Sequence, residues 1–188
     1  MVNSVTGEED RLESVLPLVK RHGAAVIGLA MDGGGIPGKP RDRLAVARRI
    51  VDRASDHGIP PQDVLIDPLV LPEGAAPGSG RKVLDTLRLV REELRVNTVC
   101  GASNVSFGLP GRPSLNAALL SMLAAAGITA VIANPLDLEC RMAILAGDLL
   151  MGHDEYAMAW IRAHRALPGV LRQGEGNPDG RPVGSPGS

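Results

Sequence analysis

The sequence predicts an α/β protein with a parallel β-sheet, and two features of the chain support this prediction. Short runs of β-branched or apolar residues, each closed by Asn, Asp, Ser or Gly, alternate with longer amphipathic segments along the 188 residues. Hydrophobic residues make up 44% of the chain but aromatic residues only 2%, so the core must consist of aliphatic side chains. Both features are typical of strands that are buried on both faces beneath Ala-rich helices.

The apolar runs are the expected strands. Each run is short and largely nonpolar, as a strand covered on both faces should be. Because an amphipathic segment follows each run, the pattern is one of repeated β-α units. The expected strands cover residues 2–5, 24–31, 64–66, 96–101 and 129–133.

The longer segments are expected to be helices because their apolar residues recur at helical spacing. In the first segment Leu12, Leu16 and Val19 share one face, while charged residues fill most other positions. Pro17 is discordant in this segment and allows a kink there. The other expected helices include residues 44–51, 82–93, 114–126, 138–150 and 156–165. The expected C-terminal glycine caps are Gly23, Gly58 and Gly127.

One domain is expected over residues 1–166, followed by a tail over residues 167–188. The last expected helix carries Trp160, the chain's only tryptophan. After this helix the sequence is rich in Gly and Pro and poor in core-forming residues, which favours a disordered tail. The same composition also suits a linker to a further domain.

Charge and hydropathy argue against two classes of partner, nucleic acids and membranes. The formal net charge of −1 gives no overall attraction to nucleic acid or to an acidic membrane surface. The arginines between positions 41 and 53 are expected on solvated helix faces. No apolar run is long enough to span a membrane, and the N-terminal sequence MVNSVTGEED lacks the basic and apolar parts of a signal peptide.

The cysteines and histidines predict no metal site. Cys100 and Cys140 are far apart and do not have the spacing of metal ligands, so reduced and mostly buried thiols are expected. The 4 histidines are scattered on helices or at helix ends, where solvated or capping roles are expected. A reducing, cytoplasmic location follows from the free cysteines.

Polar residues close each of the expected strands. In parallel β/α barrels the reactive groups collect at the C-terminal ends of the strands, so these residues are the candidates for a functional site. They are Asn3, Asp32, Asp67, Ser103 with Asn104, and Asn134 with Asp137.

Several of these residues lie in segments that together resemble a known enzyme family. The segments are NSVTGE at 3–8, IDPLVLP at 66–72, GASNVSFGLP at 101–110, NPLD at 134–137 and GDLLMGHDEY at 147–156. In combination they resemble the methyltetrahydrofolate:corrinoid methyltransferases of the pterin-binding, dihydropteroate-synthase-like superfamily. The resemblance implies a (β/α)8 TIM-barrel type of fold, of which about the last five β/α units are present. The first three strands, and an aspartate expected on the third, are then absent.

The family resemblance also implies roles for individual residues. Asp67 would accept hydrogen bonds from the amino and ring N–H groups of a pterin, and Asn3 would bond elsewhere on the same ring edge. Gly101 and Ser103 would let the backbone come close to the ligand. Asn104 matches the catalytic asparagine, which would donate a hydrogen bond to N5 as the methyl group leaves.

Two of these residues have structural alternatives. Asp67 precedes Pro68 and could simply end a strand and begin a turn. Asn3 lies close to Met1, and its alternative role is to cap the helix that begins near Glu8.

The function implied by the resemblance is transfer of the N5 methyl group of methyltetrahydrofolate to the Co(I) corrinoid of a partner protein. The chain itself then needs no metal ligands. A noncatalytic pterin-binding or complex-forming half-barrel subunit is the alternative. Dihydropteroate synthase is a weaker alternative, since that enzyme has a basic residue where this sequence has Asn104.

An arc of five strands cannot close a barrel and leaves two sheet edges unpaired. Three explanations are open: a companion chain supplies the first strands, the chain forms a homodimer across its edges, or the sequence is a truncated reading frame. The residues for pterin recognition are mostly present, but we expect weak transferase activity, or none, from the chain alone.

Overall fold

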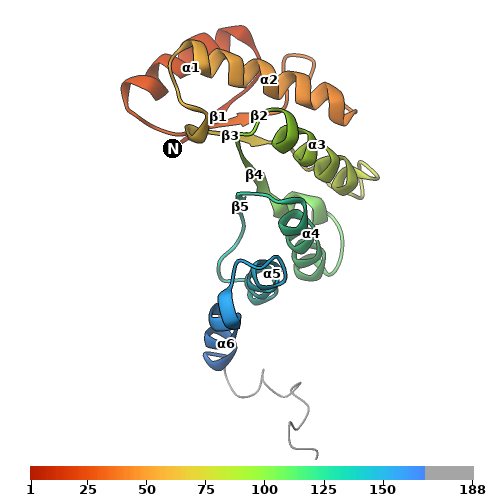
Figure 1. The fold of residues 1–188 in the computed structure, drawn as a ribbon. Coiled ribbons are helices and arrows are strands. Elements are labelled where there is room, and N and C mark those ends of the chain that lie inside the picture. The colour runs from red at the N-terminus through yellow and green to blue at the C-terminus, as the bar shows by residue number, and fades with distance from the viewer. Residues whose placement is uncertain (168–188) are drawn as a thin grey trace, which may run out of the picture.

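A computed structural model describes residues 1–167 and contains one sheet of five parallel strands in the order β1-β2-β3-β4-β5 (Figure 1). Each strand pairs with the next one along the chain, so the predicted α/β fold with repeated β-α units is confirmed. The strands are β1 (Val2–Val5), β2 (Val26–Leu29), β3 (Val64–Asp67), β4 (Asn97–Gly101) and β5 (Ala130–Ile132).

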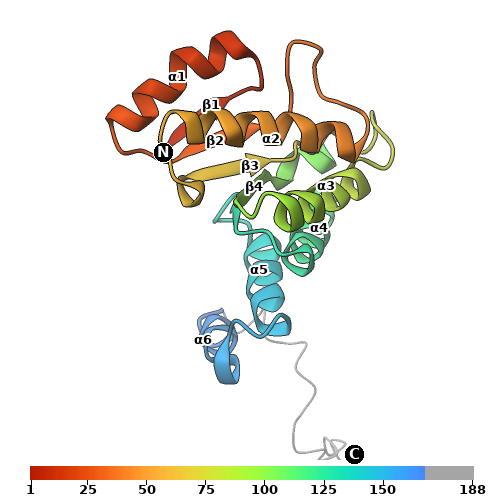
Figure 2. The ribbon, with the colours of Figure 1, turned by 45° about the horizontal axis from the view of Figure 1, so that its top comes forward.

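Helices connect the strands and pack against one another in chain order from α1 to α5. Figure 2 shows α1 and α2 side by side over the first three strands. The helices are α1 (Glu9–Arg21), α2 (Pro40–Asp56), α3 (Ser79–Glu93), α4 (Arg112–Ala126), α5 (Leu138–Leu150) and α6 (Met158–Arg165). The short 3-10 turns are η1 (Pro61–Asp63), η2 (Ala102–Ser106) and η3 (Glu155–Ala157).

The helix ends follow the expected glycine signals. Gly23, Gly58 and Gly127 have φ angles of 55°, 70° and 80°, in the left-handed region that a residue without Cβ adopts most easily. Pro17 lies inside α1, which continues as one helix from Glu9 to Arg21.

The alternation of side chains along the strands divides the core into two faces. On one face Val26, Val64 and Ile66 pack in a large cluster with residues of α1 and α2. The other face carries a small cluster built from Ile27, Leu65 and Val99, and no helix residue of the described chain joins this cluster. Side chains alternate along a strand, so residues two positions apart share a face. Asp67 follows Leu65 by two positions and Gly101 follows Val99 by two, so both belong to this second, helix-free face.

The two outer strands each have one unpaired edge within residues 1–167, since β1 pairs only with β2 and β5 only with β4. Large apolar side chains are exposed at the β5 end, including Ile132 at 49% and Leu136 at 90%. No helix in the described part of the chain is long and apolar enough to cross a membrane.

The predicted tail lies outside the described residues, apart from Leu167. That side chain is buried, at 6% exposure, just after α6.

Candidate functional site

Asp67 ends β3 and is a buried carboxyl group, only 8% exposed. Its Oδ1 atom accepts the backbone N–H of Leu69 at 2.8 Å, which forms a tight turn at the end of the strand. No hydrogen bond to its Oδ2 atom is present among residues 1–167. Burial raises the pKa of Asp67 to about 6. The residue therefore begins a turn, as the structural alternative predicted, and still has one carboxylate oxygen open to a ligand.

Ser103 and Asn104 lie in η2, directly after β4, and both residues are exposed. The backbone carbonyl of Ser103 accepts hydrogen bonds from Arg112 Nη2 at 3.1 Å and Ser106 Oγ at 3.2 Å. Arg112 Nε also donates to Ser106 Oγ at 3.0 Å. No local sequence pattern marks Arg112, yet this side chain from the start of α4 holds the η2 turn in place.

The side chain of Asn104 folds back toward the end of β4. A Cβ atom added to Gly101 would lie 3.8 Å from Asn104 Nδ2, and no other atom beyond the two neighbouring residues of the chain would come within 4 Å of it. Gly101 therefore leaves an open space beside the carboxamide. A flat ligand that approached the backbone at Gly101 would come within reach of the Asn104 amide.

The loops that follow β3 and β4 are joined to each other. The backbone N–H of Glu73 donates to the carbonyl of Val105 in η2 at 2.9 Å. The Glu73 carboxylate in turn accepts the N–H groups of Gly78 and Gly80 at the start of α3. The segments that carry Asp67 and Asn104 therefore form one hydrogen-bonded rim at the C-terminal edge of the sheet.

Asn3 lies on the same helix-free face but further along the sheet. It is exposed and pairs in register with Ile27 of β2, so one strand separates it from β3. It does not cap α1, because Glu8 is the N-cap residue and no side chain caps that helix end. The helix-capping alternative for Asn3 is therefore wrong.

The remaining strand-end residues have local bonding partners. Asn134 Oδ1 accepts the N–H of Leu136 at 3.0 Å, and Asp137 caps α5 by accepting the N–H of Cys140 at 3.2 Å. Asp32 Oδ1 accepts the N–H of Gly34 in the loop after β2. Each of these three side chains stabilises a turn or a helix end.

A small pocket lies beside Ser103, between η2, α4 and the start of α5. Asn116 of α4 lines this pocket and is only 8% exposed, and its Oδ1 atom has no hydrogen-bond partner. Nothing in the sequence pattern singles out Asn116, since a single Asn in an amphipathic helix is usually solvated.

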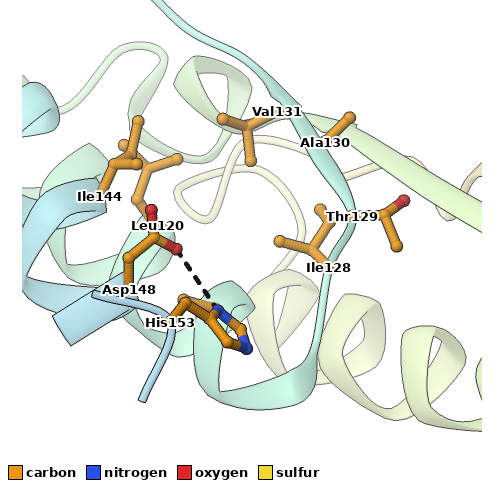
Figure 3. Close-up of a pocket in the computed structure, with 9 residues that line it drawn as sticks. Leu120, Ile128, Thr129, Ala130, Val131, Ile144, Asp148 and His153 are labelled. Atoms are coloured by element: carbon orange, nitrogen blue, oxygen red, sulfur yellow. Dashed lines mark ion pairs between the residues drawn. The ribbon is translucent and has the colours of Figure 1, made fainter. Parts of the chain in front are cut away.

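A larger and mainly apolar pocket lies beside β5 (Figure 3). It is lined by side chains that include Leu120, Ile128 and Val131, and an ion pair of 3.7 Å joins Asp148 to His153 at one side. No strand-end polar residue from the sequence analysis lines it. We therefore place the candidate site at the rim formed by β3 and β4, not in this pocket.

Both cysteines are free and buried, as expected. Burial, with the Asp67 charge nearby, raises the pKa of Cys100 to about 12. Burial and a hydrogen bond with Asp137 raise the pKa of Cys140 to about 11. Both thiols are therefore protonated near neutral pH and are poor nucleophiles. In residues 1–167, no group of three or more His, Cys, Asp or Glu side chains could hold a metal ion.

Comparison with known proteins decides the family. A family model described as "Pterin binding enzyme" matches residues 1–134. The chain belongs to this family. The matched residues include all the predicted site residues, from Asn3 to Asn104.

Curated relatives of this member of the pterin binding enzyme family include a methyltransferase and methionine synthases. It is 26% identical to a methylcorrinoid:tetrahydrofolate methyltransferase of Eubacterium limosum over 170 residues, which are 88% of this chain and 62% of the relative. It is 31% identical to the methionine synthase of Mycobacterium tuberculosis over 144 residues, and 32% identical to that of Mycobacterium leprae over 145 residues. Those matches cover 70% of this chain but 12% of each synthase. The chain thus spans under two thirds of the length of the relatives it matches.

Proposed function

We propose that residues 1–166 form the pterin-binding unit of a methyltransferase that moves a methyl group between N5 of methyltetrahydrofolate and the cobalt of a corrinoid. The relatives' names support the reaction class, since one names both a methylcorrinoid and tetrahydrofolate. The observation that carries the proposal is the shared rim, in which a buried carboxylate and an exposed carboxamide lie on loops joined by the bond from Glu73 to Val105.

Recognition of the pterin is assigned first to Asp67. A pterin edge presents an amino group and a ring N–H, and a carboxylate is the side chain best suited to accept both hydrogen bonds. The Leu69 N–H already holds Oδ1, so the carboxylate meets the ligand in a fixed orientation. Asn3, on the same face of the sheet, is assigned a hydrogen bond elsewhere on the pterin ring. Gly101 and Ser103 are assigned the backbone surface beside that ring.

Asn104 is assigned the catalytic role. When the methyl group leaves, N5 changes from a tertiary amine to a nitrogen that must gain a proton. A carboxamide N–H donates a hydrogen bond that strengthens as negative charge develops on N5, and it does so without titrating. The open space beside Gly101 gives N5 access to this amide.

The corrinoid supplies the cobalt that accepts or donates the methyl group, and we assign it to a partner protein. Ser103 and Asn104 are exposed, so the rim is accessible to a group brought by another protein. The chain's own thiols are buried and protonated and take no part in this scheme. Transfer in either direction involves the same two bonds, one from the methyl carbon to N5 and one from the methyl carbon to cobalt. One site therefore serves both directions.

Binding of methyltetrahydrofolate is expected to weaken in acid because the pKa of Asp67 is about 6. The ionised carboxylate accepts the pterin hydrogen bonds, and protonation removes this form as the pH falls below 6. The Kd should rise about tenfold between pH 7 and pH 5. Calorimetric titrations across this range measure the effect, and the Asp67→Asn variant reports any contribution from titration of the ligand. Equal pH dependence in both proteins would contradict the assignment.

Replacing Gly101 by Ala is expected to weaken pterin binding without harming the fold. Gly101 has a φ of −78°, which any residue adopts, and the added methyl group would meet no atom closer than 3.8 Å. The free energy of unfolding should change by less than about 0.5 kcal/mol. The affinity for methyltetrahydrofolate should fall about tenfold, because the methyl group would occupy space needed by the ligand. Urea denaturation and calorimetry measure the two effects, and unchanged affinity would remove Gly101 from the site.

A second polypeptide is proposed to pair with the open edges of the sheet. Both β1 and β5 have an unpaired side within residues 1–167, and the apolar pocket of Figure 3 lies beside β5. The occupant is a companion chain that supplies further strands, or a second copy of this chain. If that assembly serves only to bind the pterin, the protein is the noncatalytic subunit named above as the alternative.

The reaction is tested with free cobalamin reduced to Co(I). Methyl transfer from methyltetrahydrofolate replaces the absorption spectrum of Co(I) with that of methylcobalamin, and the reverse reaction starts from methylcobalamin and tetrahydrofolate. Turnover in either direction that is lost in the Asn104→Ala variant supports the enzyme. Pterin binding without turnover in either direction supports the noncatalytic alternative.

A further inference from the structure

Arg43 is a buried cation at the start of α2. The side chain is only 1% exposed, although it was expected on a solvated helix face with the other arginines between 41 and 53. No ion pair involving Arg43 occurs in residues 1–167, whereas Arg41 and Arg48 of the same helix pair with Glu93 at the surface. An unpaired buried charge is costly unless other polar groups surround it, so its partners must be strong acceptors.

Those partners are backbone carbonyl groups from two loops at the C-terminal edge of the sheet. Arg43 Nε donates to the carbonyl of Pro37, in the loop after β2, at 2.8 Å. Its Nη1 donates to the carbonyls of Pro68 and Leu69, in the loop after β3, at 2.8 Å each. One side chain therefore fastens the β3 loop to the β2 loop, directly beside Asp67.

The segment held by Arg43 has an unfavourable backbone conformation. Leu69 has a φ of 63°, in the left-handed region that residues with a Cβ atom avoid. This conformation directs the Leu69 N–H to Asp67 Oδ1 at 2.8 Å. The strained turn persists only if its surroundings hold it, and the two hydrogen bonds from Arg43 to Pro68 and Leu69 do so.

We propose that Arg43 is a positioning residue for Asp67: by holding the Pro68–Leu69 turn, it fixes the carboxylate with Oδ1 engaged and Oδ2 free to bind the pterin. Only the binding of a pterin by Asp67 Oδ2 rests on the proposed function. The positioning itself is a property of the free chain. Arg43 does not contact the ligand in this scheme and acts through the turn.

The positioning is tested first without ligand, by hydrogen exchange of the Leu69 amide measured by NMR in the full chain. Arg43→Met keeps an unbranched, flexible side chain but removes the guanidinium and all its hydrogen bonds, and should speed Leu69 exchange at least tenfold while Ile66 in β3 stays protected. Arg43→Lys keeps the charge and one donor group, and should give an intermediate rate; it also serves if Arg43→Met fails to fold. Arg48→Met, which removes only a surface arginine from α2, is the matched control and should leave Leu69 unchanged. Leu69 protection that is the same in the wild type and both Arg43 variants would overturn the proposal.

The second test is a double-mutant cycle on affinity for methyltetrahydrofolate, measured by calorimetry. Arg43→Met should weaken binding about tenfold in the wild-type background but less than twofold in the Asp67→Asn background, because Arg43 acts through the carboxylate. Equal losses in the two backgrounds would show a general structural role and overturn the proposal. If the wild-type chain binds no pterin, the proposed function fails, and the exchange experiment still decides whether Arg43 holds the turn.

Discussion

Replacing Asn104 by Ala is expected to slow methyl transfer by about 10²–10³-fold while changing the affinity for methyltetrahydrofolate by less than about threefold. The reason is that a hydrogen bond to N5 gains most of its strength as the methyl group departs. A donor of this kind contributes to the transition state and little to the ground state. The exposed carboxamide lies outside the core, so its loss should not affect folding.

Single-turnover measurements with Co(I) cobalamin give the rate of transfer, and calorimetry gives the affinity. Asn97→Ala is the matched control, because Asn97 also carries a carboxamide but lies at the start of β4, at the opposite end of that strand from Asn104 in η2, and donates to the carbonyl of Gln62 at 2.8 Å. That variant should retain the wild-type rate. Equal loss of rate and affinity in Asn104→Ala, or loss of neither, would contradict the role given to Asn104.

Replacing Asp67 by Asn is expected to weaken methyltetrahydrofolate binding about 100-fold and, at the same time, to stabilise the free protein above pH 6. Hydrogen bonds to a charged acceptor are stronger than those to a neutral one, and an amide offers the pterin donors one fewer oxygen. The gain in stability arises because burial raises the pKa of Asp67 from its ordinary value of 3.8 to about 6. At neutral pH the folded protein therefore holds an ionised carboxylate in an unfavourable environment.

The sign of this stability effect follows from linkage. The folded-state pKa lies above the unfolded one, so Asp67 favours the folded state below about pH 4, and this contribution is lost as the pH rises through about 6. Asp67→Asn should thus be more stable than the wild type by on the order of 2 kcal/mol at pH 8, and the gap should close by about pH 4. Urea denaturation of the wild type and the variant at pH 8 and at about pH 4 measures this difference in the free energy of unfolding. A variant that is less stable than the wild type at pH 8 would contradict the account of this carboxyl.

Much of the fold was predictable because each strand and helix follows the period of its own apolar residues. Buried parallel strands are short and almost wholly apolar, so the strand ends could be located to within two or three residues, as with β3 at Val64–Asp67. Once the strands were known, the common direction of a parallel sheet placed Asp67, Gly101 and Asn104 at one edge. The structure brings these residues to a single rim.

Other features of the site depend on contacts between loops, which no local pattern encodes. Arg43 was expected on a solvated helix face, since its spacing does not distinguish it from Arg41 and Arg48. Its burial arises because the loops after β2 and β3 close over it and offer it three carbonyl groups. The bond between Glu73 and Val105 has the same origin, as it joins residues of two successive loops.

The most direct test of the pterin site is a calorimetric titration of the full 188-residue chain with methyltetrahydrofolate, run with light scattering to give the oligomeric state. We predict saturable binding with one pterin per chain, which Asp67→Asn reduces about 100-fold and Asn97→Ala leaves unchanged. A folded wild-type chain that shows no saturable binding at millimolar ligand, whatever its oligomeric state, would contradict the assignment of the pterin site to this rim.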